Sequence, residues 1–185
     1  SAPDRAPTPP VNPATRRLAT LGCACALAAS AGAATSDDYP RLRPGLWEVS
    51  SRTSAQAKGE PPAKSTMCLD EATAREMYRV SQGMMEGMCS KFEVKHVGNR
   101  YTSEALCKLG ESRMTARSTM TLSGDSAYRI DGSSTYDPPF MGMKEATTTV
   151  EAKHAGACKP GQQPGDITTA AGQTINIRNL TKAGK

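Results

Sequence analysis

The chain has few large side chains with which to fill a hydrophobic core. Aromatic residues make up only 4% of its 185 residues, as two Phe, one Trp and five Tyr, and hydrophobic residues make up 37%. This length accommodates one domain with tails and excludes a large multidomain enzyme. Because apolar burial is the main source of folding free energy, so sparse a core requires a second stabiliser.

Concentrated charge is also missing. The formal net charge is +5, no run of Lys and Arg occurs, and aromatic residues are not interleaved with Arg. These features exclude the usual nucleic-acid-binding patterns, so we expect no nucleic-acid partner. The row Arg113, Arg117 and Arg129 is a candidate surface for an acidic envelope partner, although acidic residues dilute it and a mixed-charge solvated face is the default interpretation.

Motifs of the common catalytic classes are absent. The sequence has no G-x-S-x-G elbow, no H-E-x-x-H helix and no phosphate-binding loop. Only His96 and His154 are available as imidazole bases, and both fall on the predicted inward face of strands, where they could lie near one another. We therefore expect a protein that is not an enzyme and has no cofactor.

Residues 16–35 have the pattern of a secretory signal peptide. Arg16 and Arg17 precede an uncharged run from Leu18 to Ala34 that ends in small residues. The run is too short and too rich in Ala and Gly for a transmembrane helix. We expect Sec-type export with cleavage near Ala31 to Ala34, a periplasmic or secreted domain, and no transmembrane segment after cleavage. Residues 1–35 then form an N-terminal extension and signal peptide.

Four cysteines follow this leader, namely Cys68, Cys89, Cys107 and Cys158. In a small exported chain four cysteines predict two disulfides, which supply the missing stabiliser. Their spacing contains no C-x-x-C pair, which argues against a structural zinc site.

The hydrophobic pattern predicts a mostly β, α+β domain over residues 36–158. Residues 45–50 alternate as a strand, and 70–82 read as a short amphipathic helix with Asp70 as N-cap and Gly83 as its stop. Further alternation at 90–96, 101–107, 113–122, 128–136 and 146–154 gives an antiparallel meander of about six strands. We expect residues 56–65 to form a polar loop and 159–185 a flexible C-terminal tail, with at most a short strand at 174–177.

The predicted hairpin at Gly98-Asn99 constrains the disulfides. A two-residue turn there places Cys107 opposite Ser90, so Cys89 and Cys107 point to opposite faces. This leaves Cys68–Cys89 with Cys107–Cys158, or Cys68–Cys107 with Cys89–Cys158. We favour the first.

The predicted inward face is rich in Ala, Ser, Thr and Met. We expect its core residues to be Trp47, Phe92, Met77 and Tyr78. So many small side chains predict either a poorly filled core or a cavity, and a small apolar ligand held between helix and sheet would fill such a cavity.

Methionine is the most unusual count, at nine. Thioethers are ligands for Cu(I), so this methionine-rich chain has a candidate soft-metal site. Its candidate ligands are Met84, Met85, Met88, Met141, Met143, His96 and His154. The alternative is that Met fills irregular gaps in a core short of aromatics.

Several ordered features resemble the bacterial domain-of-unknown-function family 3617. They are the segment 42–49 (LRPGLWEV), Cys68 before an acidic helix start, Cys89, Cys107 in a strand, Gly124-Asp125 and Cys158. The resemblance covers about residues 42–158 and implies an exported, periplasmic domain with no established activity and no family catalytic residues. We therefore predict a non-catalytic binding or envelope-interaction module, with a Cu(I)-binding protein and a small apolar ligand carrier as alternatives.

Overall fold

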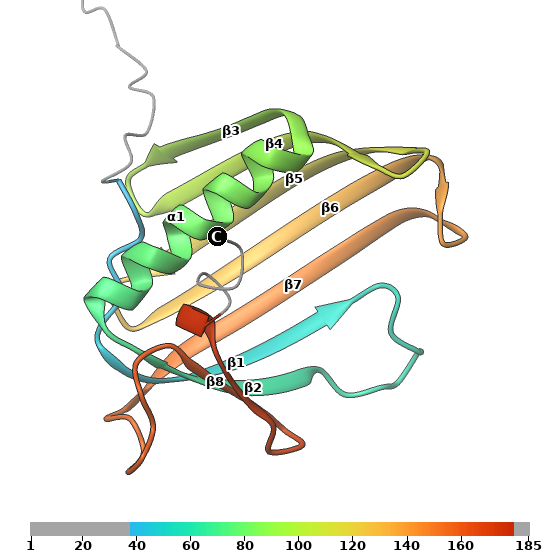
Figure 1. Ribbon diagram of the computed structural model, residues 1–185. Helices are drawn as coiled ribbons and strands as arrows, with labels where there is room; N and C mark the ends of the chain where they lie inside the picture. The colour runs from blue at the N-terminus through green and yellow to red at the C-terminus, as the bar shows by residue number, and fades with distance from the viewer. Residues whose placement is uncertain (1–37, 180–185) are drawn as a thin grey trace, which may run out of the picture. The chain divides into compact units, whose positions relative to one another are not determined.

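The computed structural model describes residues 38–179, which form an antiparallel sheet of nine strands with one long helix on one face (Figure 1). The predicted signal peptide lies outside the described residues. In chain order the elements are β1 (Gly45–Thr53), β2 (Ala63–Leu69), α1 (Glu71–Met88), β3 (Cys89–Val97), β4 (Arg100–Leu109), β5 (Ser112–Ser123), β6 (Ala127–Phe140), β7 (Met143–Gly156), β8 (Asp166–Thr169) and β9 (Thr174–Asn176).

The strand order is β3-β4-β5-β6-β7-β1-β2-β8-β9. The predicted fold class, a mostly β antiparallel sheet with one helix and two disulfides, is confirmed. The sheet has nine strands where we expected about six, because β2 and β8 were not recognised in the sequence and β9 was expected only as at most a short strand at 174–177. Within residues 38–179, no helix is both long enough and apolar enough to cross a membrane.

The two faces of the sheet differ sharply in charge. We call the face that α1 covers the inner face and the opposite one the outer face. At the paired strand positions of residues 38–179, the inner face carries no Asp, Glu, Lys or Arg. Successive side chains of a strand point to opposite faces, so a period-two pattern of charge produces this separation.

The core lies on the inner face. Trp47 has no exposed surface and packs with Met67, Leu69 and Ala152, while Tyr101 and Cys107 are buried on β4. The other predicted core residues, Phe92, Met77 and Tyr78, are only half-buried.

Helix α1 begins as predicted but ends later. Asp70 is its N-cap, and its side chain accepts a hydrogen bond from the backbone N–H of Thr73. The helix continues through Gly83 to Met88. Neither Gly83 nor Gly87 has a positive φ, so neither marks a turn, and the helix ends where the chain enters β3 at Cys89. The predicted stop at Gly83 is therefore wrong.

The four cysteines of residues 38–179 all form disulfides, but in a pairing that we disfavoured. Cys68 bonds to Cys158 and Cys89 bonds to Cys107. Both the favoured pairing and the alternative that we left open are therefore wrong.

An irregularity at the start of β3 explains this error. Lys91 pairs with Leu106, as the turn at Gly98-Asn99 predicts, but the register shifts between Cys89 and Lys91 so that Cys89 pairs with Cys107. A bulge places two residues of one strand opposite a single residue of its partner. The bulge therefore places Cys89 directly opposite Cys107, so that both side chains point to the same face of the hairpin.

The sheet also extends beyond the boundary that we expected at residue 158. Strand β8 pairs with β2, and β9 pairs with β8, within the segment that we assigned to a flexible tail. The backbone N–H of Gly165 donates a hydrogen bond to the Cys68 carbonyl oxygen. This bond holds the start of β8 close to the Cys68–Cys158 disulfide. Residues 180–185 lie outside the described part of the chain.

Candidate functional site

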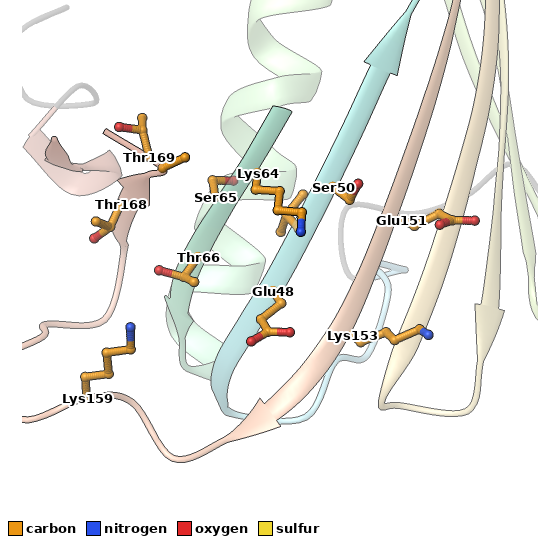
Figure 2. A pocket seen from close by; sticks show the side chains of 12 residues that line it. Glu48, Ser50, Lys64, Ser65, Thr66, Glu151, Lys153, Lys159, Thr168 and Thr169 are labelled. Atoms are coloured by element: carbon orange, nitrogen blue, oxygen red, sulfur yellow. The ribbon is translucent and has the colours of Figure 1, made fainter. Parts of the chain in front are cut away.

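The outer face has a hollow of about 480 Å³ over β1, β2, β7 and β8 (Figure 2). Lys64, Lys153 and Lys159 line it together with Glu48 and Glu151. Glu48 lies directly opposite Lys153 in the register, so charges of both signs are mixed across this surface. Such a mixture is typical of an ordinary solvated sheet face and indicates no particular ligand.

A second hollow, which we call the groove, lies between α1 and the inner face. It has a volume of about 260 Å³ and is largely apolar. None of its lining residues is charged. They are Pro40, Leu42, Met67, Leu69, Ala74, Met77, Tyr78, Ser81, Met120, Tyr128 and Ile130.

The first wall of the groove is the segment 38–44, which leads into β1. Tyr39 in this segment is buried and donates a hydrogen bond to Glu71 Oε1 at 3.0 Å. Arg43 pairs with Asp125 in the turn between β5 and β6, at 2.8 Å. These contacts fix the segment across the ends of the strands, so Pro40 and Leu42 are held against the groove.

The second wall is one face of α1. Ala74, Met77, Tyr78 and Ser81 are spaced at intervals of three and four residues, which places them on the same side of a helix. Because Asp70 fixes where the helix begins, the N-cap determines which side chains face the sheet.

The floor of the groove consists of neighbouring inner-face residues from separate strands. Met120 of β5 pairs directly with Ile130 of β6, and Tyr128 follows on the same face. Met67 and Leu69 complete the floor. They lie on β2, which follows β7 and β1 in the strand order. Directly opposed side chains lie close enough to form a continuous surface.

Tyr128 is the polar group most deeply set in this lining. Its ring packs against Trp47 with 5.7 Å between ring centroids. Burial raises the pKa of Tyr128, so the phenol is uncharged at neutral pH. Among residues 38–179 its hydroxyl has no hydrogen-bond partner.

Tyr78, the other phenol in the groove, has a different environment. Burial raises its pKa, while a hydrogen bond with Gln82 acts in the opposite direction, and the charge of Asp38 adds to the increase. The Tyr78 oxygen therefore interacts with a side chain of its own helix.

The candidate metal ligands are distributed over several elements. Met84, Met85 and Met88 lie at the end of α1, where Met84 is 58% exposed and Met88 is 47% exposed. Met141, which is 83% exposed, lies in the turn between β6 and β7, and Met143 begins β7. Within residues 38–179, no group of three or more His, Cys, Asp and Glu side chains is placed to hold a metal ion.

The two histidines lie far apart. His96 is on β3 and His154 on β7, with β4, β5 and β6 between them. Four strand spacings amount to roughly 19 Å. The expectation that they could lie near one another is therefore wrong.

Each histidine is held by structural partners. His96 Nδ1 lies 2.7 Å from Oδ1 of Asp38, and its ring stacks on Tyr101. His154 Nε2 lies 3.0 Å from the Pro44 carbonyl oxygen, and its ring meets the Trp47 ring edge-on. Both rings thus hold the segment 38–44, which we call the lead-in segment, against the sheet.

A cavity between helix and sheet was one of two alternatives that the sequence left open, and the sequence identified only part of its lining. Met77 and Tyr78 were recognised as inward-facing residues of the helix. Met120, Tyr128 and Ile130 also stood on the predicted inward alternation, which was the signal that could have identified them. The lead-in residues had no such signal, because contacts distant in sequence determine their position.

Comparison with known proteins gives one match. No curated protein and no solved structure matches the chain. The family described as "Protein of unknown function (DUF3617)" matches residues 42–158, which is more than half of the chain. This range begins at Leu42 in the groove wall and includes all four disulfide-bonded cysteines. The chain therefore belongs to the DUF3617 family of proteins of unknown function.

Proposed function

We propose that the domain is an exported, non-catalytic binding module that holds a small apolar ligand in the groove between α1 and the sheet. The observation that carries this proposal is the composition of the groove, whose lining has no charged residue. An apolar hollow with few polar groups has the usual character of a small-molecule site.

The methionines support binding rather than packing alone. Met67, Met77 and Met120 reach the groove from β2, α1 and β5. A thioether side chain is flexible and polarizable, so it adapts to molecules of different shape. The volume of about 260 Å³ suits one small molecule or one chain of a larger lipid.

The disulfides support the exported location. Two disulfides are typical of proteins that fold in an oxidising compartment outside the cytoplasm. Together with the signal-peptide pattern of residues 16–35, they favour the periplasm.

The environments of the histidines support a role other than catalysis. His96 and His154 contact a carboxylate or backbone carbonyls, and within the described residues neither has a hydrogen bond to a Ser or Cys side chain. A general base must reach the group that it deprotonates.

Titration with N-phenyl-1-naphthylamine, an uncharged apolar fluorophore, tests the proposal. Ser81→Trp puts an indole at the rim of the groove, and we expect it to weaken binding by at least about tenfold, a difference of about 1.4 kcal/mol. Arg79→Trp makes the same change on the same helix, outside the lining, and should bind like the wild type.

If the wild-type protein binds no apolar probe, or if both tryptophan variants behave alike, the groove is not a ligand site. The interaction-module alternative would then be tested by pull-down from envelope extract at low and high salt, since screening weakens steering by surface charge. The soft-metal alternative stays a prediction, tested by Cu(I) titration of variants at Met84 and Met88.

A further inference from the structure

We infer that the ligand of this groove is an apolar molecule with one uncharged hydrogen-bonding group, such as an alcohol, ester or ketone, and that the Tyr128 hydroxyl binds that group. This inference rests on the proposed function and names the ligand class of the same groove. Three features of Tyr128 and its surroundings carry it.

The first feature is an unused polar atom. The Tyr128 ring is anchored against Trp47, yet its hydroxyl has no hydrogen-bond partner among residues 38–179. The oxygen is not among the fully buried, unbonded polar atoms of those residues, so it reaches accessible space. We assign that space to the groove, because Tyr128 is half-buried and is one of the residues that line it. A buried tyrosine hydroxyl usually has a partner, and a ligand would supply one here.

The second feature is the lack of charge around it. No Lys, Arg, Asp or Glu lines the groove, so an ionised head group placed there would have no counter-charge. Burying an unpaired carboxylate or ammonium is far more costly than burying a hydrogen-bonded neutral group. A fatty acid anion inserted head-first is therefore a poor fit, whereas a neutral hydroxyl or carbonyl is a good one.

The third feature is the contrast with Tyr78. The Gln82 amide on the same helix donates to the Tyr78 oxygen and thereby lowers the pKa of Tyr78, so this oxygen already accepts a hydrogen bond. A phenol can donate one hydrogen bond and also accept. Tyr128 is thus the lining phenol whose hydroxyl neither donates nor accepts a hydrogen bond within the described part of the chain.

Three ten-carbon competitors that displace N-phenyl-1-naphthylamine test the inference, namely decan-1-ol, decane and decanoate. In the wild type we expect decan-1-ol to bind more tightly than decanoate at neutral pH. Tyr128→Phe keeps the ring on Trp47 and removes only the hydroxyl, so it should weaken decan-1-ol about two- to tenfold and leave decane unchanged. Thermal unfolding of the variant checks that the fold is retained.

Tyr136→Phe is the matched control, because Tyr136 lies on the same strand, stacks on Phe140 and is outside the groove lining. It should bind all three competitors like the wild type. If Tyr128→Phe weakens the binding of decan-1-ol and decane equally, or weakens the binding of neither, the Tyr128 hydroxyl does not bind the polar group of the ligand. These results differ from failure of the proposed function, in which the wild type binds neither probe nor competitor.

Discussion

At the scale of single residues, Gly45 and Trp47 join the lead-in segment to the core. The Trp47 indole donates a hydrogen bond to the Arg43 carbonyl oxygen at 2.9 Å. Gly45 has a φ of +132°, a region that residues with a Cβ rarely adopt. A Cβ there would overlap the carbonyl oxygen of Gly156 and lie 2.6 Å from His154 Nε2. Glycine is therefore needed at this position for both conformation and space.

We predict that Gly45→Ala lowers the free energy of unfolding by at least about 2 kcal/mol, because it adds both backbone strain and a clash with backbone. Urea denaturation measures this change. Gly83→Ala is the matched control, since a Cβ at Gly83 meets nothing within 4 Å and α1 continues through it. It should stabilise by about 0.5–1 kcal/mol. Equal effects of the two substitutions would contradict this account of Gly45.

At the scale of elements, the start of α1 depends on Asp70. Its carboxylate accepts from the Thr73 N–H at 2.7 Å and lies 3.3 Å from the Arg178 guanidinium. Burial alone would raise the pKa of Asp70. The hydrogen bonds from Thr73 and the charge of Arg178 outweigh burial and lower the pKa below its usual value.

A group with a lowered pKa stabilises the fold above its ordinary pKa, and this contribution is lost as the pH falls through the lowered value. We predict that Asp70→Ala costs about 1 kcal/mol at neutral pH. Asp70→Asn keeps a capping oxygen and should cost less. The stability difference between wild type and Asp70→Asn should shrink as the pH falls from about 5 to about 2. A difference independent of pH would rule out the charge effect.

The sequence predicts the elements that have a local signal. Alternation identifies the faces of β3 to β7, and Asp70 marks the start of α1. The end of α1 could not be predicted, because Gly83 is compatible with a helix as well as with its end. The bulge near Ser90 leaves no local pattern, and the disulfide pairing failed for that reason.

The remaining errors come from contacts between distant residues. Strand β8 has four residues, β9 has three, and β8 is held by pairing with β2, roughly a hundred residues earlier. A cavity between helix and sheet was one of two alternatives that the sequence left open, but the wall formed by residues 38–44 depends on pairs such as Arg43 with Asp125. No local pattern encodes such a pair.

At the scale of the whole molecule, two disulfides stabilise a sparse core. Cys68 and Cys158 are separated by 90 residues, whereas Cys89 and Cys107 are separated by 18. A cross-link removes more conformational entropy from the unfolded chain when its loop is longer.

We therefore predict that replacing Cys68 and Cys158 by Ala costs about 4.5 kcal/mol, and replacing Cys89 and Cys107 costs about 3 kcal/mol. Urea denaturation of the two double variants gives both values. If removal of the Cys89–Cys107 disulfide lowers the free energy of unfolding more than removal of the other disulfide does, packing around the sulfur atoms in the native state outweighs loop entropy.

The central claim is that the groove binds an apolar ligand, and the methionines offer the most direct test. Their methyl groups can be labelled with ¹³C and observed by NMR during titration with decan-1-ol. We expect the resonances of Met67, Met77 and Met120, which line the groove, to shift. Those of the exposed Met84, Met88 and Met141 should stay in place. Shifts confined to the exposed methionines, or no shifts at all, would contradict the claim.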